Sequence, residues 1–346
     1  MTIAQGTSTK QLRRLVLASV TGGFCTACAD APLNYMYGHG PAASSIARLG
    51  WWLVIVSAVV IAIVTILVVA AALRRAATRE PMAREGMGAH GGLSWIYIGG
   101  LLLPALILIL SFALTLGSLH ATMRPPRDPV ATVQIIGHRW WWEVRYVDRD
   151  PTKTIVTANE IHVPVGQPVR LELTSADVIH SFWVPQLAGK TDVIPGLTNV
   201  AWLQADRAGV FRGACTEYCG LQHANMSPIV IAEPVMAFQT WVASQRADAA
   251  TPTDPDAAAG QLVFQKSTCA TCHTIRGSET LGRVGPDLTH LASRLTLAAG
   301  TLENTRGNLA GWIANTQALK PGNDMPVMTL APNDFQALLA YLETLK

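Results

Sequence analysis

The chain has 346 residues, which exceeds the usual size of one domain and predicts two or three structural units. Its net charge is only +3, and its basic residues form no block interleaved with aromatic residues, so nucleic acid is set aside as a partner. Charged residues make up 14% of the sequence, and the long charge-free runs all lie before residue 120. A membrane-embedded part is therefore expected to precede a remainder of ordinary soluble composition.

The first segment, residues 1–28, has the layout of a signal peptide or lipoprotein signal. Basic residues precede a modest apolar stretch that ends in a Cys-Thr-Ala-Cys sequence. The small residues before Cys28 resemble a lipoprotein processing site, although Cys25 stands where an aliphatic residue is usual. Export of the N-terminus is expected, and lipidation at Cys28, simple cleavage and retention stay open.

Residues 46–120 predict a two-helix transmembrane anchor. The run 51–73 carries no charge, and at about 1.5 Å per residue it extends about 34 Å, enough to cross a hydrocarbon core of about 30 Å. A second apolar run covers 93–119 and contains Pro104, which membrane helices tolerate, so we expect this proline to kink the helix rather than end it.

The charge bias around these two runs predicts the orientation of the chain. The connector between them carries four arginines, whereas residues 29–45 contain no Lys or Arg. Because basic connectors stay in the cytoplasm, everything after residue 120 is expected on the outer side of a bacterial plasma membrane, with the chain crossing it twice.

The remainder divides by composition into two folded parts and a linker. Residues 125–242 are rich in Val, Ile, Thr and Trp in short alternating stretches, which predicts a β-sandwich or barrel. Residues 243–258 have few large apolar side chains and predict a flexible linker. Residues 259–346 show helical periodicity at both ends and predict a helical domain.

The most specific motif is the C-x-x-C-H sequence of Cys269, Cys272 and His273. Its thiols can form thioethers to the vinyl groups of haem while the imidazole ligates iron. A redox dithiol or half a zinc site are the alternatives, but no second cysteine pair lies in this part to complete a zinc site. An electron-carrying haem needs a second axial ligand; Met325, directly before a proline, is our choice over Met328.

A second constellation lies between residues 215 and 226. Cys215, Cys219, His223 and Met226 place two thiols, an imidazole and a thioether in one loop, a donor set that selects copper or zinc, and the thioether favours copper. Two thiolates suggest two bridged copper ions, each completed by a histidine. His180, at the end of a predicted strand, is the candidate for the second imidazole.

At this point a family resemblance becomes clear. The segments 137–143, 177–185, 190–196 and 215–226 resemble subunit II of cytochrome c oxidase. With the two membrane helices and the C-x-x-C-H motif, the resemblance to a subunit II carrying a fused C-terminal cytochrome c domain covers nearly the whole chain. It implies a multidomain fold: a transmembrane hairpin, an all-β cupredoxin-like Greek-key domain and an all-α class I cytochrome c domain.

The resemblance also implies a ligand set and further roles. The implied ligands of a mixed-valence dinuclear copper centre (CuA) are His180, Cys215, Cys219, His223, Met226 and the backbone carbonyl of Glu217. The Glu217 carboxylate is implied to reach a magnesium ion at the boundary with the catalytic subunit. Trp140 becomes the candidate for receiving the electron, beside an alternative as a packing residue of a strand. The resemblance fails at one point. Many members of that family carry a glutamate near the cytoplasmic start of the second helix that feeds a proton path, whereas residues 93–97 of this chain contain no acid. Glu85 is a weak substitute for that glutamate, so the resemblance does not imply a proton-entry role here.

The implied function is that of subunit II of a terminal cytochrome c oxidase. Electrons would reach covalent haem c, then CuA, then a catalytic subunit that reduces O2 to water and translocates protons. Implied partners are oxidase subunit I, subunit III, membrane lipid and a donor such as a soluble cytochrome c or an upstream bc complex. Two other classes stay open: the CuA subunit of a nitric oxide reductase, and a free-standing membrane-anchored electron carrier or copper-handling protein.

Overall fold

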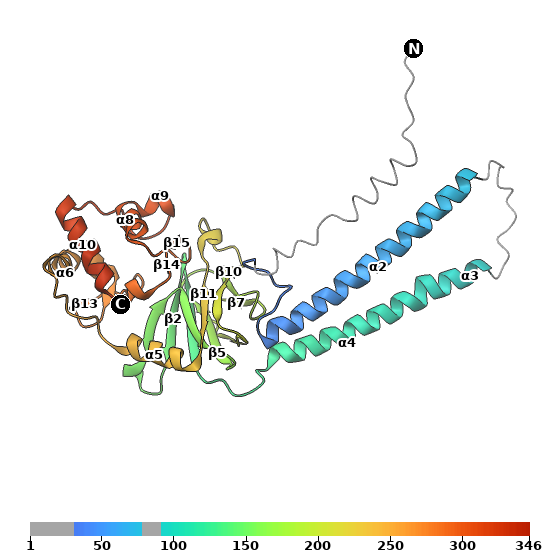
Figure 1. Ribbon diagram of the computed structural model, residues 1–346, viewed down its shortest axis with the longest axis horizontal. Helices are drawn as coiled ribbons and strands as arrows, with labels where there is room; N and C mark the ends of the chain where they lie inside the picture. Colours follow the sequence, from blue (N-terminus) through green and yellow to red (C-terminus); the bar gives the residue numbers. More distant parts are fainter. Residues whose placement is uncertain (1–30, 78–90) are drawn as a thin grey trace, which may run out of the picture.

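The computed structural model describes residues 31–77 and 91–346. Figure 1 shows three parts in a row: a pair of long helices, a β-domain in the middle, and a mainly helical domain on the far side of it. The predicted signal segment 1–28, with Cys25 and Cys28, and the substitute acid Glu85 lie outside the described residues.

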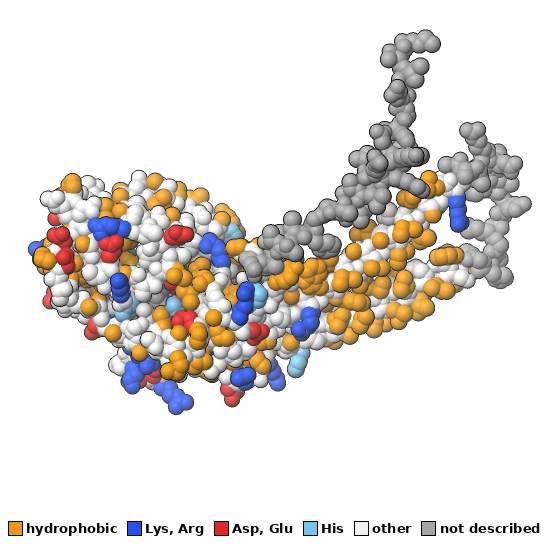
Figure 2. Space-filling model, viewed as in Figure 1, with side chains coloured by type: hydrophobic (Ala, Val, Ile, Leu, Met, Phe, Trp, Pro, Cys, Tyr) orange, Lys and Arg blue, Asp and Glu red, His pale blue; other side chains and the backbone are white. Residues whose placement is uncertain are grey.

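Two apolar helices form the part predicted as the membrane anchor. The first is α2 (Pro41–Ala77); the second is continuous through α3 (Gly91–Trp95), the π-helical η2 (Ile96–Leu102) and α4 (Leu103–Met123). Both are long and apolar enough to cross a membrane. Their side chains are exposed, as the hydrophobic surface along both helices in Figure 2 shows. A hydrogen bond from Trp52 Nε1 to Ser111 Oγ (3.1 Å) joins them.

The second helix runs through Pro104 without ending there. Pro104 lacks a backbone N–H, and the preceding turn of the helix is the π-helical η2, at the Gly99-Gly100 pair. A π-turn changes the local hydrogen-bond pattern, which is one way in which membrane helices accommodate a proline. The helix therefore continues past Pro104, as expected, and ends at Met123, beyond the predicted apolar run 93–119.

The β-domain consists of short strands that form a sandwich. A five-stranded sheet has the order β3-β2-β1-β5-β8, and two three-stranded sheets have the orders β10-β6-β7 and β4-β11-β9. The strands are β1 (Thr132–His138), β2 (Trp141–Val147), β3 (Ile155–Ala158), β4 (Glu160–Pro164), β5 (Val169–Ser175), β6 (His180–Trp183), β7 (Thr191–Val193), β8 (Asn199–Leu203), β9 (Gly209–Arg212), β10 (Ala214–Cys215) and β11 (Ile229–Glu233). The pairs β1/β5 and β4/β11 are parallel and the others antiparallel. The two parallel pairs require connections that cross between sheets, and the strands together form the predicted cupredoxin-like β-domain.

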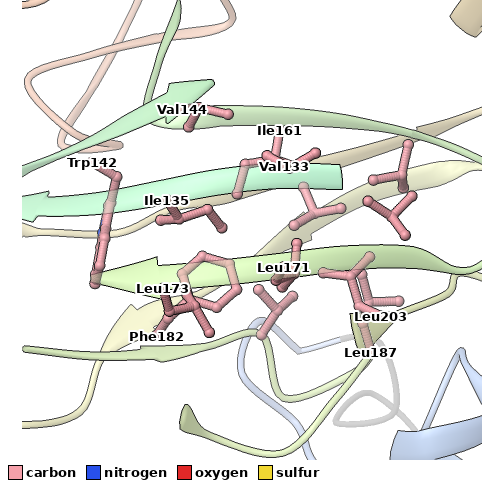
Figure 3. Packing of buried hydrophobic residues seen from close by; sticks show 14 of the residues in the cluster. Val133, Ile135, Trp142, Val144, Ile161, Leu171, Leu173, Phe182, Leu187 and Leu203 are labelled. Atoms are coloured by element: carbon pink, nitrogen blue, oxygen red, sulfur yellow. The ribbon is translucent and has the colours of Figure 1, made fainter. Parts of the chain in front are cut away.

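Alternation of buried and exposed side chains along β1, β2 and β5 builds the core of this domain. Figure 3 shows Ile135, Leu171 and Leu173 converging between the sheets with Phe182. Trp142, fully buried, closes one end of this core, and its ring packs edge-on against Phe182 and His180. The well-packed core thus extends up to the predicted copper ligand His180 and gives it a rigid support.

The C-terminal domain is mainly helical. Its helices are α6 (Pro255–Lys266), α7 (Cys269–Cys272), α8 (Arg306–Ala314), α9 (Thr316–Leu319) and α10 (Pro332–Thr344). Two small hairpins accompany them: β12 (Thr274–Ile275) with β13 (Thr280–Leu281), and β14 (Thr296–Leu297) with β15 (Leu302–Glu303). The helices α6 and α10 cross at Gly260, where an added Cβ would lie 1.9 Å from the carbonyl oxygen of Ala337. Only glycine permits this close approach.

The segment between the two soluble domains is shorter than the predicted linker 243–258. Helix α5 (Val235–Arg246) extends the β-domain, and α6 begins at Pro255, so the non-helical connection covers 247–254. Arg276 of the helical domain donates to the carbonyls of Gln245 (2.5 Å) and Ala247 (3.1 Å). The connection is therefore held against the helical domain at its start, a feature that composition alone does not reveal.

Candidate functional site: a sulfur and imidazole cluster beside an apolar cavity

Two neighbouring strands bring the predicted copper ligands together. Cys215 ends β10, which pairs antiparallel with β6, and Cys215 lies opposite Phe182 in the register. His180 begins β6. The loop from β10 to β11 then returns Cys219, His223 and Met226 to the same end of the sandwich.

The sulfur and nitrogen atoms form a compact cluster. The Sγ atoms of Cys215 and Cys219 are 3.8 Å apart. Nδ1 of His180 lies 3.9 Å from the Cys215 sulfur, and Nδ1 of His223 lies 3.7 Å from the Cys219 sulfur. Sδ of Met226 is 4.0 Å from Cys219 Sγ. The ligand atoms of His180, Cys215 and Cys219 all lie within 4.8 Å of one another.

The donors are arranged in a nearly symmetric way about the two sulfurs. Each thiol has one imidazole beside it; the first also has the Glu217 carbonyl oxygen at 3.3 Å, and the second has the Met226 thioether. The Glu217 side chain itself is exposed. Soft sulfur with imidazole suits copper, and two shared sulfurs with a separate imidazole each fit a pair of ions better than a single ion.

Asp177 orients the buried His180. Nε2 of His180 donates to Asp177 Oδ1 (2.9 Å), so Nδ1 carries the lone pair and faces the thiols. Burial acts to lower the pKa of His180, but its hydrogen bonds with Cys215 and Asp177 outweigh burial and raise that pKa. The Asp177 carboxylate also accepts from the Val178 N–H (2.6 Å), so the same side chain holds the turn that leads to His180.

The two thiols share their protons unequally. The hydrogen-bond contact between the two sulfurs is the main reason that the pKa of Cys215 is lowered and that of Cys219 is raised. Both are free cysteines rather than a disulfide. A cation that binds both sulfurs would displace the remaining proton, as metal binding by thiolates requires.

A largely apolar cavity lies on the other side of Trp140 from this cluster and is lined by every predicted haem residue. Cys269, Cys272, His273 and Met325 line it, and so does the alternative ligand Met328. Further lining side chains come from the core of the helical domain and include Phe264, Leu291, Leu297, Ile313 and Leu342. An apolar cavity with two thiols, an imidazole and a thioether on its wall fits a covalently attached haem.

The imidazole of His273 is held in one tautomer. Nδ1 donates to the carbonyl oxygen of Pro286 (2.7 Å), so Nε2 carries the lone pair and is available to iron. Burial lowers the pKa of His273, which keeps the ring neutral. A Cβ on Gly285 would lie 2.6 Å from Cε1 of this ring, so the Gly-Pro pair closes tightly over the imidazole.

The loop that carries Met325 is fixed by hydrogen bonds to its main chain. The carbonyl of Met325 accepts from Thr316 Oγ1 (2.7 Å) and Gln317 Nε2 (3.2 Å), and its N–H donates to Asn323 Oδ1 (2.9 Å). Both Met325 and Met328 pack against the helical core. The structure therefore brings both methionines to the cavity.

Trp140 lies between the sulfur cluster and the cavity. Its Nε1 donates to the carbonyl of Cys219 (3.1 Å), and its side chain lines the cavity. A Cβ on Gly220 would lie 3.1 Å from the indole on one side, and a Cβ on Gly322 would lie 3.6 Å from it on the other. Only 8% of Trp140 is exposed, because the helical domain covers it.

Sequence reasoning missed several polar residues at the cavity. Arg139 and Lys320 line it from different domains, and Arg294 lines it with a buried Nε that has no hydrogen-bond partner among the described residues. Lys320 lies five residues before Met325, in a segment whose only recognisable ligand is that methionine. No local pattern distinguishes these side chains from ordinary surface cations.

Comparison with known proteins matches two segments of the chain to two families. Residues 131–234 match the family "Cytochrome C oxidase subunit II, periplasmic domain", and residues 257–346 match the family "Cytochrome c". The "Cytochrome c oxidase subunit 2" of Bacillus subtilis (strain 168) is 30% identical over 268 residues, which cover 73% of this chain and 74% of that protein. The chain belongs to the cytochrome c oxidase subunit 2 family.

Other relatives match smaller parts of the chain. The subunit 2 of Alkalihalophilus pseudofirmus is 40% identical over 220 residues, covering 63% of this chain and 62% of that protein, so the chain spans less than two thirds of that relative. A crystal structure of the periplasmic domain of subunit II of cytochrome oxidase of Bradyrhizobium japonicum has 30% sequence identity and a TM-score of 0.33, covering 35% of this chain and 96% of that one.

Membership of the subunit 2 family confirms the predicted fold class. Two apolar helices, a cupredoxin-like β-domain and a helical cytochrome c domain all occur in this chain. The sulfur and imidazole cluster lies within the part matched to subunit II, and the C-x-x-C-H motif lies within the part matched to cytochrome c. We refer to these matched parts below as the copper domain (131–234) and the haem domain (257–346).

Proposed function

We propose that this chain is the electron-accepting subunit II of a membrane-bound terminal cytochrome c oxidase. It would take electrons through a covalent haem c, pass them to a dinuclear CuA centre and on to a catalytic subunit that reduces O2 to water with proton translocation. One observation carries this proposal: the sulfur and imidazole cluster and the haem-type cavity lie on either side of Trp140 in a single chain.

The copper ions would be held by the cluster described above. The proposed ligands are His180, Cys215, Cys219, His223, Met226 and the backbone carbonyl of Glu217. When bound, the pair would supply a one-electron carrier. The protein's part is to keep both sulfurs in place on β10 and its loop, and to aim the His180 lone pair through Asp177.

The haem would be attached through Cys269 and Cys272, with His273 and Met325 as axial ligands. The bond to the Pro286 carbonyl leaves Nε2 of His273 free to ligate iron, which supports His273 as an axial ligand. The hydrogen bonds of its main chain hold Met325 in one position, which supports it as the other. When bound, the haem would supply a second one-electron carrier. The apolar side chains around it would exclude water and raise its reduction potential.

Trp140 is proposed as the residue that connects the two carriers. We expect Trp140→Phe to slow electron transfer from haem to copper several-fold, because the substitution removes the indole N–H that bonds to the Cys219 carbonyl while it keeps an aromatic ring. Flash reduction of the haem, followed by the absorbance of both centres, measures the rate. Trp241→Phe, at an indole that stacks on His162 away from the site, is the matched control. An unaltered rate in Trp140→Phe would return this residue to a packing role.

The surroundings of the chain are also part of the proposal. The two apolar helices would cross a bacterial plasma membrane, with the copper and haem domains on the outer side. Partners would be the catalytic subunit I, subunit III, membrane lipid, and a donor such as a soluble cytochrome c or an upstream bc complex. The exposed Glu217 carboxylate, on the copper loop, would reach a magnesium ion at the subunit I boundary.

Purification of the intact complex from solubilised membranes tests this function. We expect the chain to co-purify with a multi-helix haem protein that consumes O2, and to contain both copper and haem. Consumption of nitric oxide instead of O2 would favour a nitric oxide reductase. A chain that carries both centres but purifies alone would favour a free-standing electron carrier.

A further inference from the structure

Lys320 crosses the interface between the two soluble domains and is almost completely buried. It is 3% exposed, although it carries an ammonium group. Its Nζ donates to the carbonyls of Trp140 (2.8 Å) and Asn225 (2.7 Å) in the copper domain and of Ala298 (2.9 Å) in its own haem domain. The three N–H groups of an ammonium thus meet three main-chain acceptors drawn from both domains.

The partners of Lys320 show that the ammonium serves this interface. All three acceptors are neutral carbonyls, and burial lowers the pKa of Lys320 to about 7. A neutral amine has only two N–H groups and would leave one carbonyl without a donor, so the geometry favours the charged form. Burial of a charge is costly unless its hydrogen bonds are satisfied, and here they are satisfied only while the domains are in contact.

Glu160 makes the reciprocal contact from the copper domain. This residue begins β4 and is also 3% exposed. Its Oε1 accepts from Thr296 N (2.8 Å) and Thr296 Oγ1 (3.0 Å), and its Oε2 accepts from Leu295 N (3.1 Å). All the hydrogen bonds of this buried carboxylate therefore come from donors in the haem domain. The buried Lys320 ammonium of the haem domain, in turn, donates to two carbonyls in the copper domain.

Further hydrogen bonds continue the same interface toward the copper loop. Gln222 Nε2 donates to the carbonyl of Pro321 (2.8 Å), and the Ser227 N–H donates to the carbonyl of Ala299 (3.0 Å). Arg212 bonds to Ser227 Oγ (3.0 Å) and to the carbonyl of Gly300 (2.9 Å). The Gln222 bond holds the Pro321-Gly322 turn, which leads to Met325, beside the indole of Trp140, and the other bonds hold the loop at Ala299 and Gly300.

We propose that Lys320 and Glu160 are positioning residues that lock the haem domain onto the copper domain in one fixed arrangement, so that electrons pass between the two sites without domain motion. This inference rests on the proposed electron-transfer function. The alternative is a haem domain that moves on its linker and meets the copper domain by diffusion, with only a raised effective concentration. In that arrangement, the charges of both residues would have to be solvated during each excursion.

The intact wild-type oxidase provides the first test. A flash-generated flavin semiquinone reduces the haem, and the first-order transfer from haem to copper is followed at increasing sucrose concentration. We expect that rate to be independent of solvent viscosity, because no domain has to move. A rate that falls in proportion to viscosity would overturn the lock, even if both centres are fully loaded.

Variants then test the two residues themselves. In the double variant Lys320→Met with Glu160→Gln, we expect transfer to slow by at least about tenfold and to become viscosity-dependent, because three carbonyls lose their donors and three donors face a neutral amide. Haem and copper content and the spectra of both centres should stay unchanged. The double variant Lys266→Met with Glu279→Gln makes the same charge changes at exposed positions of the haem domain and is the control.

The outcomes separate this inference from the proposed function. A wild-type complex that lacks copper or haem, or that does not consume O2, would contradict the function whatever its viscosity response. Loaded centres with a transfer rate unchanged in the Lys320 and Glu160 variant would contradict only the roles of these two residues. If that variant fails to take up haem, the wild-type viscosity response still decides whether the arrangement is fixed.

Discussion

We expect Cys219→Ser to abolish the spectroscopic signature of a dinuclear copper centre and to lower the copper content by at least about half, because a hydroxyl oxygen is a poor ligand for copper ions that select soft sulfur. Cys219 is the hub of the cluster. Its sulfur lies 3.8 Å from that of Cys215, 3.7 Å from the His223 nitrogen and 4.0 Å from the Met226 thioether. Loss of this one atom removes the bridge and isolates the two halves of the donor set.

Metal analysis and electron paramagnetic resonance of the purified protein measure this effect. The control is Thr216→Val, in the same loop, since the buried Oγ1 of Thr216 has no hydrogen-bond partner among the described residues. Haem content should be retained in both variants. A resonance that still shows two equivalent copper nuclei in Cys219→Ser would contradict the ligand assignment.

The second large effect is expected at the haem. Met325→Leu should remove the thioether-to-iron band and lower the reduction potential by on the order of 100 mV, within the range of roughly 0.8 V that axial ligands set. The sign follows because methionine ligation raises the potential of a cytochrome. Leucine keeps nearly the same volume, so the apolar packing around the site should survive.

Met328→Leu is the matched comparison, because both methionines line the cavity and only one can be the ligand. We expect a normal spectrum and potential in that variant, measured by absorption and redox titration. The opposite pattern, with a normal Met325→Leu and an altered Met328→Leu, would transfer the ligand role to Met328. Copper content is expected to stay constant in both.

The parts of the site that the sequence predicts well are those encoded locally. Cys269, Cys272 and His273 are neighbours in sequence, and the four copper-type donors from Cys215 to Met226 share one loop, so their proximity needs no tertiary information. His180 is different, because it lies on another strand. Only the chemical need for a second imidazole, and the resemblance to a known family, pointed to it; the β6/β10 pairing explains its position.

The interface between the domains was beyond the reach of sequence patterns. Lys320 and Glu160 are charged residues that would ordinarily be exposed, and nothing near them in sequence indicates burial. Apart from the Thr296 hydroxyl, their partners are main-chain atoms distant along the chain, which carry no side-chain signature. The burial of Trp140 follows from the same contacts, so a resemblance to relatives could not indicate it either.

The membrane helices were predicted from a property that acts within a single segment. A run of residues without charge located each of the two helices. The start of the first helix at Pro41 depends instead on tertiary contacts, because Ala42, Ala43 and Ala47 in its first turns are buried. The connection 247–254 similarly departs from the predicted linker because α5 continues to Arg246. Boundaries depend on tertiary packing more than the existence of an element does.

The reciprocal burial of Lys320 and Glu160 has a consequence for anyone who would exchange parts of this chain. Two recognisable modules joined by a short connection suggest that one cytochrome could be grafted in place of another. A graft without a lysine at this turn would leave the carbonyls of Trp140 and Asn225 without this hydrogen-bond donor. A graft without matching amides would leave the buried Glu160 carboxylate without its donors. A grafted cytochrome would therefore have to keep Lys320 and the amides that bond to Glu160, in addition to the cytochrome fold.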